Sequence, residues 1–590
     1  MIHLNNIIGK VLSSAPNLIS IMVDKLSILE DNKEHLQIGK YLKISEGNNN
    51  HIISIIQNLK AINYDVSDGL RFIIDSQPIG CITEDGLFHR GSLTLPVPTE
   101  PVYIVDTGTL DRIFRSDDEF DFPLGVLSQN KHIELNINGN KFFSKHIAVV
   151  GSTGAGKSCA VSKILQNAVG INNDQNQNST LLKNSHIVIF DIHSEYAAAF
   201  TLEEDQNFTL NDLTVDKIKL PYWLMNSEEL EAIFIESNES NSHNQVSQFK
   251  NAVILNKQKY NSHLSDITYD TPVFFAIKEV FNYIENMNRE VIGKLDGENC
   301  PKLSNGTLIT NRKDYYFSQV LDFVQSSTSK DNKASNGPFY GEFNRFVSRL
   351  ETKLSDKRLS FLLNPQKEDG SVYKTNDFEE ILKQFLGYIN KSNVTIVDLS
   401  GVPFEVLSIT VSLISRLIFD FCFHYSKLKH KNKELNDIPV LVVCEEAHNY
   451  IPRSGGAEYN SSKKSIERIA KEGRKYGLSL MVVSQRPSEV SETIFAQCNN
   501  YVALRLTNHN DQAYVRNLMP ESSNAIAEIL PNLSPGECLV VGDAVLMPTL
   551  VQLEIPKPEP KSQSIKFHSE WNLPWKDVEF SEVVKRWRKE

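Results

Sequence analysis

The stretch from Ile147 to Ser158 holds the groups with the most specific chemistry in this chain. It reads Ile-Ala-Val-Val-Gly-Ser-Thr-Gly-Ala-Gly-Lys-Ser, so that an apolar run leads into the spacing G-x-x-x-x-G-K-S. Glycines at this spacing let the backbone turn tightly and point its N–H groups at phosphate oxygens. The lysine can reach the β- and γ-phosphates of a nucleotide, and the serine hydroxyl can bind Mg²⁺. The residues predicted to bind the phosphates are Gly151, Ser152, Thr153, Gly154, Ala155, Gly156, Lys157, Ser158 and Cys159.

A phosphate loop needs a strand before it and a helix after it, and the sequence predicts both. His146–Val150 is an apolar strand candidate. After Lys157, apolar side chains recur at helical spacing, namely Ala160, Val161, Ile164, Leu165 and Ala168. The positive end of such a helix faces the same anion as the loop. This context favours a phosphate loop over an ordinary glycine-rich turn.

Two adjacent carboxylates, Glu445 and Glu446, follow the apolar run Pro439–Cys444. Charges at the end of a buried strand are costly unless they are used. In nucleotide-hydrolysing folds this position supplies one acid that supports Mg²⁺ and a second that polarises the attacking water. We assign Glu445 to the metal and Glu446 to the water; the alternative is a strand end that reaches solvent. His448 either orients Glu446 or caps a turn, and the sequence leaves both open.

A second polar strand end and a group of cations extend the candidate site. Gln485 follows the apolar run Leu478–Ser484, where it can sense the γ-phosphate or simply form backbone hydrogen bonds. Several cations precede that run, and they form either a solvated face or an arginine finger for a neighbouring subunit's nucleotide. We choose Arg474 as the finger, with Arg468 and Arg486 as alternatives. An arginine donated in trans requires an oligomer, most simply a ring.

The bulk composition bounds the size, the partners and the compartment. With 590 residues, the chain exceeds one domain of ~100–200 residues, so three or four units are expected. A net charge of −12 excludes nucleic-acid binding over the whole surface, so any DNA contact needs a local basic lining. The seven cysteines are scattered without a C-x-x-C pair, which favours free thiols over zinc ligands. Without a leader pattern or an unbroken run of about 18 apolar residues, we expect a cytoplasmic protein and no membrane partner.

Apolar patterning divides the chain into four parts. Residues 1–130 carry close-spaced short strand candidates, which favour a small barrel or sandwich. Residues 131–221 and 391–547 alternate almost continuously apolar strands with helices, as a doubly wound parallel sheet requires. Residues 222–390 are expected to form an inserted helical subdomain. Residues 548–590, which contain Trp571, Trp575 and Trp587, are expected to form an extended tail that packs on a neighbour.

The predicted core strands are seven apolar runs, and a turn precedes the last of them. The run Leu533–Glu537 is interpreted as this turn. The strand candidates are His146–Val150, His186–Asp191, Val394–Asp398, Pro439–Cys444, Leu478–Ser484, Asn500–Leu506 and Glu537–Val541.

Taken together, these motifs resemble the HerA family of the HerA/FtsK superfamily. Besides the phosphate loop, the similar pieces are Phe190–Tyr196 (Phe-Asp-Ile-His-Ser-Glu-Tyr), Glu445–Asn449 (Glu-Glu-Ala-His-Asn), Lys471–Gly477 (Lys-Glu-Gly-Arg-Lys-Tyr-Gly) and Val483–Pro487 (Val-Ser-Gln-Arg-Pro). The resemblance covers most of the chain and is weakest over 222–390 and the tail. One departure is Ser194, where the family often has Gly, and it leaves the roles of Asp191 and Glu195 open.

The resemblance implies an α/β fold with a RecA-like P-loop NTPase core, an N-terminal HAS-barrel-like domain and an inserted helical subdomain. It also implies a homohexameric ring that hydrolyses ATP with Mg²⁺ at subunit boundaries and passes double-stranded DNA through its centre. Family members act with an effector, either a nuclease or a sirtuin-like NAD-hydrolase, in DNA-end processing or anti-phage defence. Carried over by position, Lys157, Ser158, Glu445, Glu446, Gln485 and Arg474 keep the roles given above.

Arg453, Lys463 and Lys464 are candidates to grip the DNA backbone from loops that face the pore. The alternative is that these three cations are solvated loop charges.

Two other functions share the motif set. One is an export ATPase of the conjugation and secretion class, which the expected lack of a membrane helix disfavours. The other is a scaffold that assembles and gates the effector with little translocation; because motor and scaffold both need an intact ATP site, the sequence does not separate them.

Overall fold

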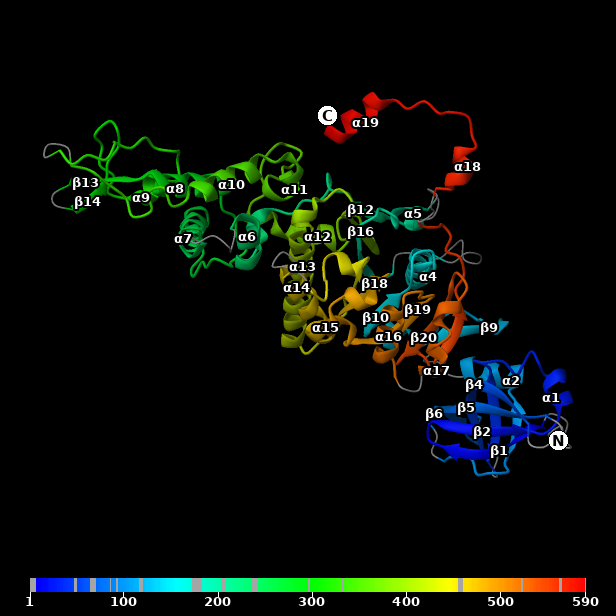
Figure 1. Ribbon diagram of the computed structural model, residues 1–590. Helices are drawn as coiled ribbons and strands as arrows, with labels where there is room; N and C mark the ends of the chain where they lie inside the picture. The colour runs from blue at the N-terminus through cyan, green and yellow to red at the C-terminus, as the bar shows by residue number, and fades with distance from the viewer. Residues whose placement is uncertain are drawn as a thin grey trace.

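The computed structural model shows a β-barrel, an α/β core, a helical arm and a C-terminal tail (Figure 1). In Figure 1 the barrel is blue, the arm is green and extends to one side of the core, and the tail is red and runs away from the core. The structure describes residues 7–588 except 47–49, 64–69, 85, 92–93, 116–119, 172–182, 203–207, 236–241, 296–297, 330–332, 455–459, 521–523 and 562–564.

The N-terminal strands close into a barrel, as expected. They are hydrogen-bonded in the order β2-β1-β7-β3-β4-β5, and β2 pairs back onto β5 to close the ring. Ile19, Ile21 and Val23 alternate inward along β2 and are fully buried, as a half-exposed barrel strand requires. The strands are β1 (Ile7–Ala15), β2 (Leu18–Val23), β3 (Tyr41–Glu46), β4 (Asn50–Asn63), β5 (Leu70–Ile82), the short β6 (Phe88–Arg90) beside β5, and β7 (Pro101–Ile104).

The core is built on a sheet with the strand order β12-β16-β11-β17-β18-β10-β19-β20-β21-β8-β9. The pairs from β12 to β19 are parallel, and the remaining pairs are antiparallel. Every residue of β10, β16, β17 and β18 is buried, because helices cover both faces of such a sheet. The parallel strands are β10 (His146–Val150), β11 (His186–Asp191), β12 (Leu210–Leu213), β16 (Val394–Asp398), β17 (Val440–Cys444), β18 (Leu478–Ser484) and β19 (Cys498–Leu504).

Four of the predicted core strands, β10, β11, β16 and β18, have the predicted bounds, and the other three are displaced by one or two residues. The α/β P-loop core with an N-terminal barrel is therefore confirmed. The helices that matter below are α4 (Lys157–Val169), α13 (Phe404–Lys431) and α14 (Asn460–Glu472).

The antiparallel edge of the core combines segments from distant parts of the sequence. β8 (Phe122–Leu127) pairs with β21 (Thr549–Gln552), which pairs with β20 (Glu537–Gly542), and β9 (Asn130–Ile137) forms the outer edge. Residues 122–130, expected in the N-terminal domain, and residues 549–552, expected in the tail, therefore belong to the core sheet. Short alternating strands look alike whether they close a barrel or extend an open sheet, so the local pattern placed these boundaries differently.

The insertion forms an arm of helices that ends in a small sheet. As expected of a helical subdomain, the insertion contains the helices α6 (Ser227–Phe234), α7 (Ser242–Tyr260), α8 (Ile277–Arg289), α10 (Asn344–Ser355) and α12 (Phe378–Phe385). The sheet β14-β13-β15 was not predicted, because its strands are short and β15 has only two residues. Its strands are β13 (Val291–Leu295), β14 (Glu298–Pro301) and β15 (Ser335–Asn336).

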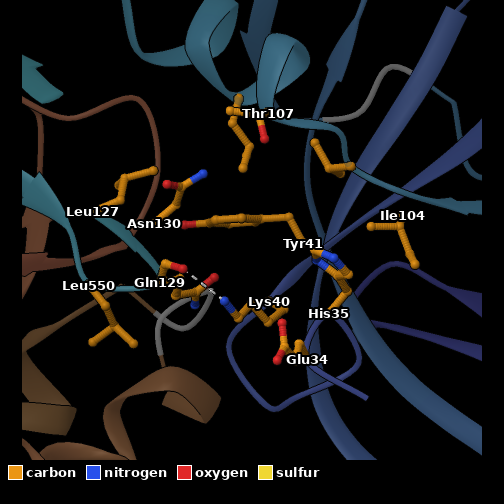
Figure 2. Close-up of a pocket in the computed structure, with 12 residues that line it drawn as sticks. Glu34, His35, Lys40, Tyr41, Ile104, Thr107, Leu127, Gln129, Asn130 and Leu550 are labelled. Atoms are coloured by element: carbon orange, nitrogen blue, oxygen red, sulfur yellow. Dashed lines mark hydrogen bonds between the residues drawn. The ribbon is translucent and has the colours of Figure 1, made fainter. Parts of the chain in front are cut away.

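The barrel contacts the antiparallel edge of the core around a cavity of about 150 Å³ (Figure 2). Lys40 of the barrel donates from Nζ to the carbonyl of Gln129, between β8 and β9, at 3.1 Å. Gln129 in turn donates to the carbonyl of Gly39. Burial raises the pKa of Tyr41, on the barrel wall of this cavity, to about 12. The barrel is thus joined to the core through reciprocal polar contacts at one edge of the sheet.

In the described part of the chain, α13 is the one helix long and apolar enough, by length and composition, to cross a membrane. Of the most apolar 18-residue stretch of this helix, 78% is buried inside the protein. The helix packs against α14 and the insertion, where Arg416 pairs with the buried Glu229 of α6 at 2.8 Å. Serine, threonine and single charges interrupt the apolar residues of α13, so the helix contains no unbroken apolar run of the length that was looked for in the sequence.

Candidate nucleotide site

The phosphate loop connects β10, near the middle of the core sheet, to α4. The N–H of Ser152 donates to the carbonyl of Arg505 at 2.8 Å, which anchors the loop beside the end of β19. Gly154 and Gly156 adopt left-handed φ values of 74° and 94°, which glycine reaches without strain. A Cβ atom at Gly156 would lie only 3.3 Å from the backbone nitrogen of Gly536. Glycine at 156 therefore allows both the turn and the close packing of a second chain segment.

The second segment that packs here is Leu533–Glu537, which the sequence predicts to form a turn. It does form a turn before β20, and the N–H of Gly536 donates to the carbonyl of Ala155 at 3.2 Å. The N–H of Ser534 donates to the Glu537 carboxylate at 3.0 Å, which closes the turn. The turn therefore packs against the phosphate loop and supports it, and we assign it no part in the chemistry.

Lys157 and Ser158 are the first two residues of α4, and their side chains lie beside different carboxylates. Lys157 is 8% exposed, and its Nζ lies 3.9 Å from Oε1 of Glu446. Ser158 donates from Oγ to Oε2 of Glu195 at 2.7 Å. Cys159 is half-buried in the same turn of the helix. The loop therefore presents its two reactive side chains beside acids that come from two other strand ends.

Glu445 and Glu446 follow β17, and both are almost fully buried. The hydroxyl of Tyr196 donates to Glu445 at 3.0 Å. Burial raises the pKa of Glu445, and the adjacent charge of Glu446 raises it further. A buried carboxylate whose pKa is raised in this way favours a cation beside it, which suits a metal-supporting acid. The metal role of Glu445 stays a prediction.

Glu446 has a left-handed backbone, with φ of 44° and ψ of 48°. A non-glycine residue in this region costs about 1–3 kcal/mol, and such costs concentrate at functional sites. Its Oε2 lies 3.3 Å from Nδ1 of His448, which also lies 3.3 Å from the hydroxyl of Ser484. Burial lowers the pKa of His448, which favours the neutral imidazole. Of the two roles left open for His448, this contact favours orienting Glu446.

Gln485, at the end of β18, lies against the phosphate loop. Its Oε1 accepts a hydrogen bond from the hydroxyl of Thr153 at 2.7 Å. Its backbone nitrogen lies 3.5 Å from Oε2 of Glu446. Gln485 therefore lies between the loop and the acid assigned to the water, as a sensor of the γ-phosphate requires.

The three candidate fingers occupy three different environments. Arg474 is exposed before the first residue of β18, at the amino-terminal edge of the sheet. Burial lowers the pKa of His146, the first residue of β10, to about 4, and the charge of Arg474 contributes to this shift. The five residues of β10 span roughly 16 Å, at about 3.3 Å per residue, between that edge and the phosphate loop. Arg474 is therefore separated from the nucleotide site of its own chain.

The two alternatives differ from Arg474. Arg468 lies over the ring of Phe419 at 4.2 Å and near Asp420 at 3.7 Å, so packing accounts for it. Arg486 pairs with Glu489 at 2.9 Å and lines a shallow pocket together with Thr153. Of the three arginines, Arg486 lies at the phosphate-loop edge of its own chain.

Of the cations proposed to grip DNA, Arg453 and Lys464 are exposed and Lys463 is half-buried, and each has a local partner. Arg453 pairs with Glu492 at 3.0 Å and lies over the ring of Tyr514. Lys464 pairs with Glu228 at 2.9 Å, and Lys463 donates to the carbonyl of Arg453 at 3.1 Å. Exposed pairs of this kind are weak, so a polyanion can replace them. Their contact with DNA stays a prediction.

The roles of Asp191 and Glu195 stayed open from the sequence. The structure places the loop after β11, which carries Glu195, in the site. Asp191 is fully buried and accepts from the backbone N–H groups of Tyr196 at 2.9 Å and His193 at 3.2 Å. Ser194 adopts a left-handed φ of 57°, so the path favoured by glycine is kept despite the larger residue. The loop thereby brings Glu195 to Ser158 and Tyr196 to Glu445. An acid where a buried strand ends, the signal used for Glu445, also marked Asp191, the last residue of β11.

These residues fit a magnesium nucleotide. The hydroxyl of Ser158 donates a hydrogen bond to Glu195, which leaves its oxygen lone pairs for a cation. Lys157 is held at the start of a 13-residue helix, where an anion is stabilised. A Cβ atom at Gly154 would contact nothing within 4 Å, so the loop has open space above it. A phosphate loop after a central strand of a parallel sheet, with paired acids after the next strand but one, defines a P-loop nucleotide hydrolase.

Comparison with known proteins gives the family. The family model described as "Helicase HerA, central domain" matches residues 122–418. A probable DNA double-strand break repair helicase HerA of Methanocaldococcus jannaschii is 23% identical over 544 residues, which cover 88% of this chain and 92% of the relative. The DNA double-strand break repair helicase HerA of Sulfolobus acidocaldarius is 24% identical over 483 residues, which cover 80% and 76%.

Two solved structures are also similar. VirB4 of Thermoanaerobacter pseudethanolicus has a TM-score of 0.43 at 12% identity, covering 74% of this chain and 97% of that one. The plasmid coupling protein TrwB in complex with ADP and Mg²⁺ has a TM-score of 0.41 at 12% identity, covering 77% and 93%.

Because the family model spans half of the chain, the chain belongs to the HerA helicase family. It is an ATP-hydrolysing P-loop enzyme, and the resemblance stated from its motifs is confirmed.

Proposed function

We propose that this chain is the subunit of an ATP-driven double-stranded DNA translocase whose copies form a ring, most simply a hexamer. One observation carries the proposal. The phosphate loop, the acid pair and Gln485 converge at one edge of the sheet, whereas Arg474 lies at the opposite edge. A site completed by the next subunit accounts for this separation, because the finger then comes from a neighbour.

The proposed chemistry assigns one task to each side chain. Lys157 holds the β- and γ-phosphates, and Glu446 orients the attacking water with support from His448. Mg²⁺, held by Ser158 with Glu445 near it, supplies charge neutralisation at the phosphates. Arg474 of the next subunit stabilises the charge of the transition state, and Gln485 relays loss of the γ-phosphate to loops at the pore.

The DNA substrate is proposed from two facts. Several relatives that match most of this chain are named as helicases of DNA double-strand break repair. The chain carries a net charge of −12, so DNA contact needs a local lining inside the ring, for which Arg453, Lys463 and Lys464 are the candidates. Such contacts grip the phosphate backbone without reading the base sequence.

We further propose that the ring works with an effector protein, a nuclease or a sirtuin-like NAD-hydrolase, in DNA-end processing or anti-phage defence. The strongly acidic chain suits a basic docking face on that partner. A ring that only assembles and gates the effector is the competing function. In that case a Lys157→Ala ring keeps effector activity although ATP hydrolysis is lost.

The tail is proposed to join neighbouring copies. Every described residue from 565 to 588 is exposed, including Trp571 at 77%, Trp575 at 93% and Trp587 at 83%. A soluble chain rarely presents so much aromatic surface to water without a partner. Deleting residues 562–590 is expected to lower the assembled mass in light scattering. A deletion variant that keeps the ring mass and its solubility contradicts tail docking.

The main experiment measures ATP turnover of the full chain with and without linear double-stranded DNA. We expect DNA to raise the turnover of the assembled wild type and to have no effect on Lys157→Ala, which loses turnover. A monomer that hydrolyses ATP at full rate, indifferent to DNA, contradicts the proposed translocase.

A further inference from the structure

The start of the C-terminal tail lies along the helix that follows the phosphate loop. We name residues 554–561 the strap. Glu554 pairs with Lys163 of α4 at 2.8 Å. Gln166 of α4 is fully buried, donates to the carbonyl of Pro558 at 2.8 Å and accepts from the N–H of Lys557 at 3.2 Å. A buried amide that makes both bonds fixes the strap in one register on the helix.

The strap ends at the acid that contacts Ser158. The backbone N–H of Lys561 donates to the backbone carbonyl of Glu195 at 2.9 Å. The carboxylate of Glu195 accepts from the hydroxyl of Ser158 at 2.7 Å. Pro560, directly before Lys561, is buried, so this end of the strap is packed rather than solvated. Two hydrogen bonds therefore connect the tail to the serine predicted to bind the metal.

The other side of Glu195 is held by the core. Asp191 accepts from backbone groups on both sides of it, at His193 and Tyr196. Ser194 is left-handed at φ 57°, a conformation that costs free energy in a non-glycine residue. Interactions around such a strained loop have to maintain it. The strap supplies one of these interactions from a segment more than 350 residues away in the sequence.

We propose that Glu195 is a positioning residue for the hydroxyl of Ser158, and that the strap holds Glu195 in that position. A hydroxyl has one proton to donate and two lone pairs. When Glu195 accepts this hydrogen bond, the lone pairs of Ser158 are left for the space where Mg²⁺ and the phosphates would bind. The inference rests on the proposed use of magnesium nucleotide, and it makes the C-terminal segment part of the metal-binding arrangement.

The test uses two substitutions at one position in the full-length chain. Lys561→Pro removes the backbone N–H that bonds to Glu195, whereas Lys561→Ala keeps it. The readout is the affinity for a fluorescent ADP analogue, measured with Mg²⁺ and with EDTA. We expect Lys561→Pro to lower the Mg²⁺-dependent gain in affinity roughly three- to tenfold, the effect of one lost hydrogen bond. Lys561→Ala is expected to match the wild type, and affinity in EDTA is expected to be equal in all three.

A double substitution separates positioning from general damage. Glu195→Ala is expected to reduce the same Mg²⁺-dependent gain, and adding Lys561→Pro to it is expected to cause no further loss, because the strap acts through Glu195. Additive losses, a normal gain in Lys561→Pro, or equal losses with Mg²⁺ and EDTA each overturn the inference. If the wild type itself shows no Mg²⁺-dependent nucleotide binding, the proposed function fails instead.

Discussion

The hydroxyl of Thr153 in the phosphate loop donates to the side-chain oxygen of Gln485 at 2.7 Å. These residues lie more than 330 positions apart in the sequence, at the ends of β10 and β18, which are neighbouring parallel strands. The oxygen of the Gln485 amide accepts from Thr153, and the NH₂ group of the same amide can donate to the γ-phosphate of a bound nucleotide. The Gln485 amide therefore offers a direct route by which nucleotide state reaches the segment after β18.

We expect Gln485→Ala to bind nucleotide with nearly wild-type affinity and to lose most of the stimulation of ATP turnover by DNA. The reason is that the amide relays the loss of phosphate and contributes only about one hydrogen bond to binding, or ~1 kcal/mol. The measurement is ATP turnover over a titration with linear DNA. Thr153→Val, which removes the partner hydroxyl alone, is the matched control and is expected to keep stimulation. Full stimulation in Gln485→Ala contradicts the sensor role.

Glu446→Gln is expected to separate binding from hydrolysis. The amide keeps the size of the side chain but cannot take up a proton, so turnover is expected to fall by roughly 10²–10⁴ while nucleotide affinity is retained. Lys157→Ala is expected to lose both, because the phosphates lose their charge partner. Steady-state hydrolysis and equilibrium nucleotide binding check the two variants. Near-normal turnover in either variant removes that residue from the proposed chemistry.

Arg474→Ala is expected to leave nucleotide binding by its own subunit intact and to lower turnover in the ring by roughly a thousandfold. Lys475→Ala removes a neighbouring exposed cation and is the matched control, with turnover near the wild type. Rings mixed from wild-type and Arg474→Ala subunits test the action in trans. We expect activity to fall more steeply than the mutant fraction rises; a proportional fall indicates a finger that acts within one chain.

His146 is expected to make the core less stable in mild acid. Its Nδ1 accepts from the N–H of Leu480 at 3.0 Å and its Nε2 contacts the carbonyl of Ala470 at 2.9 Å, so the neutral ring satisfies both. Burial lowers its folded pKa from 6.5 to about 4. Between these pH values the unfolded chain binds more protons than the folded chain, so the free energy of unfolding falls as the pH drops.

The expected loss from this group is about 1.3 kcal/mol between about pH 7.5 and pH 5.5, and up to about 3 kcal/mol near pH 4. Urea unfolding of the wild type and of His146→Gln at both pH values measures it. Because other groups also titrate, the quantity to compare is the difference between the two proteins' losses. Equal losses in both proteins contradict the assignment to His146.

Much of the parallel core could be predicted because its information is local. β10, β11, β16 and β18 have the predicted bounds, since an apolar run between turn residues is sufficient to mark a buried strand. The phosphate loop and the acid pair were found in the same way, because their residue types and spacing follow from the chemistry of phosphate and metal. The edge strands β8 and β21 were assigned to other domains, because an edge is defined by its partner.

The amino-acid sequence alone determined the class of enzyme, and it predicts which groups bind the phosphates and how the domains are ordered. Only the tertiary structure decided that Ser158 donates a hydrogen bond to Glu195, that the tail reaches Glu195 through Lys561, and that Arg474 lies at the edge away from its own site. The physical reason is the range of the interactions. Helix and strand patterns and the phosphate loop arise between residues close in sequence, whereas these contacts join distant segments and exist only once the sheet has brought the strand ends together.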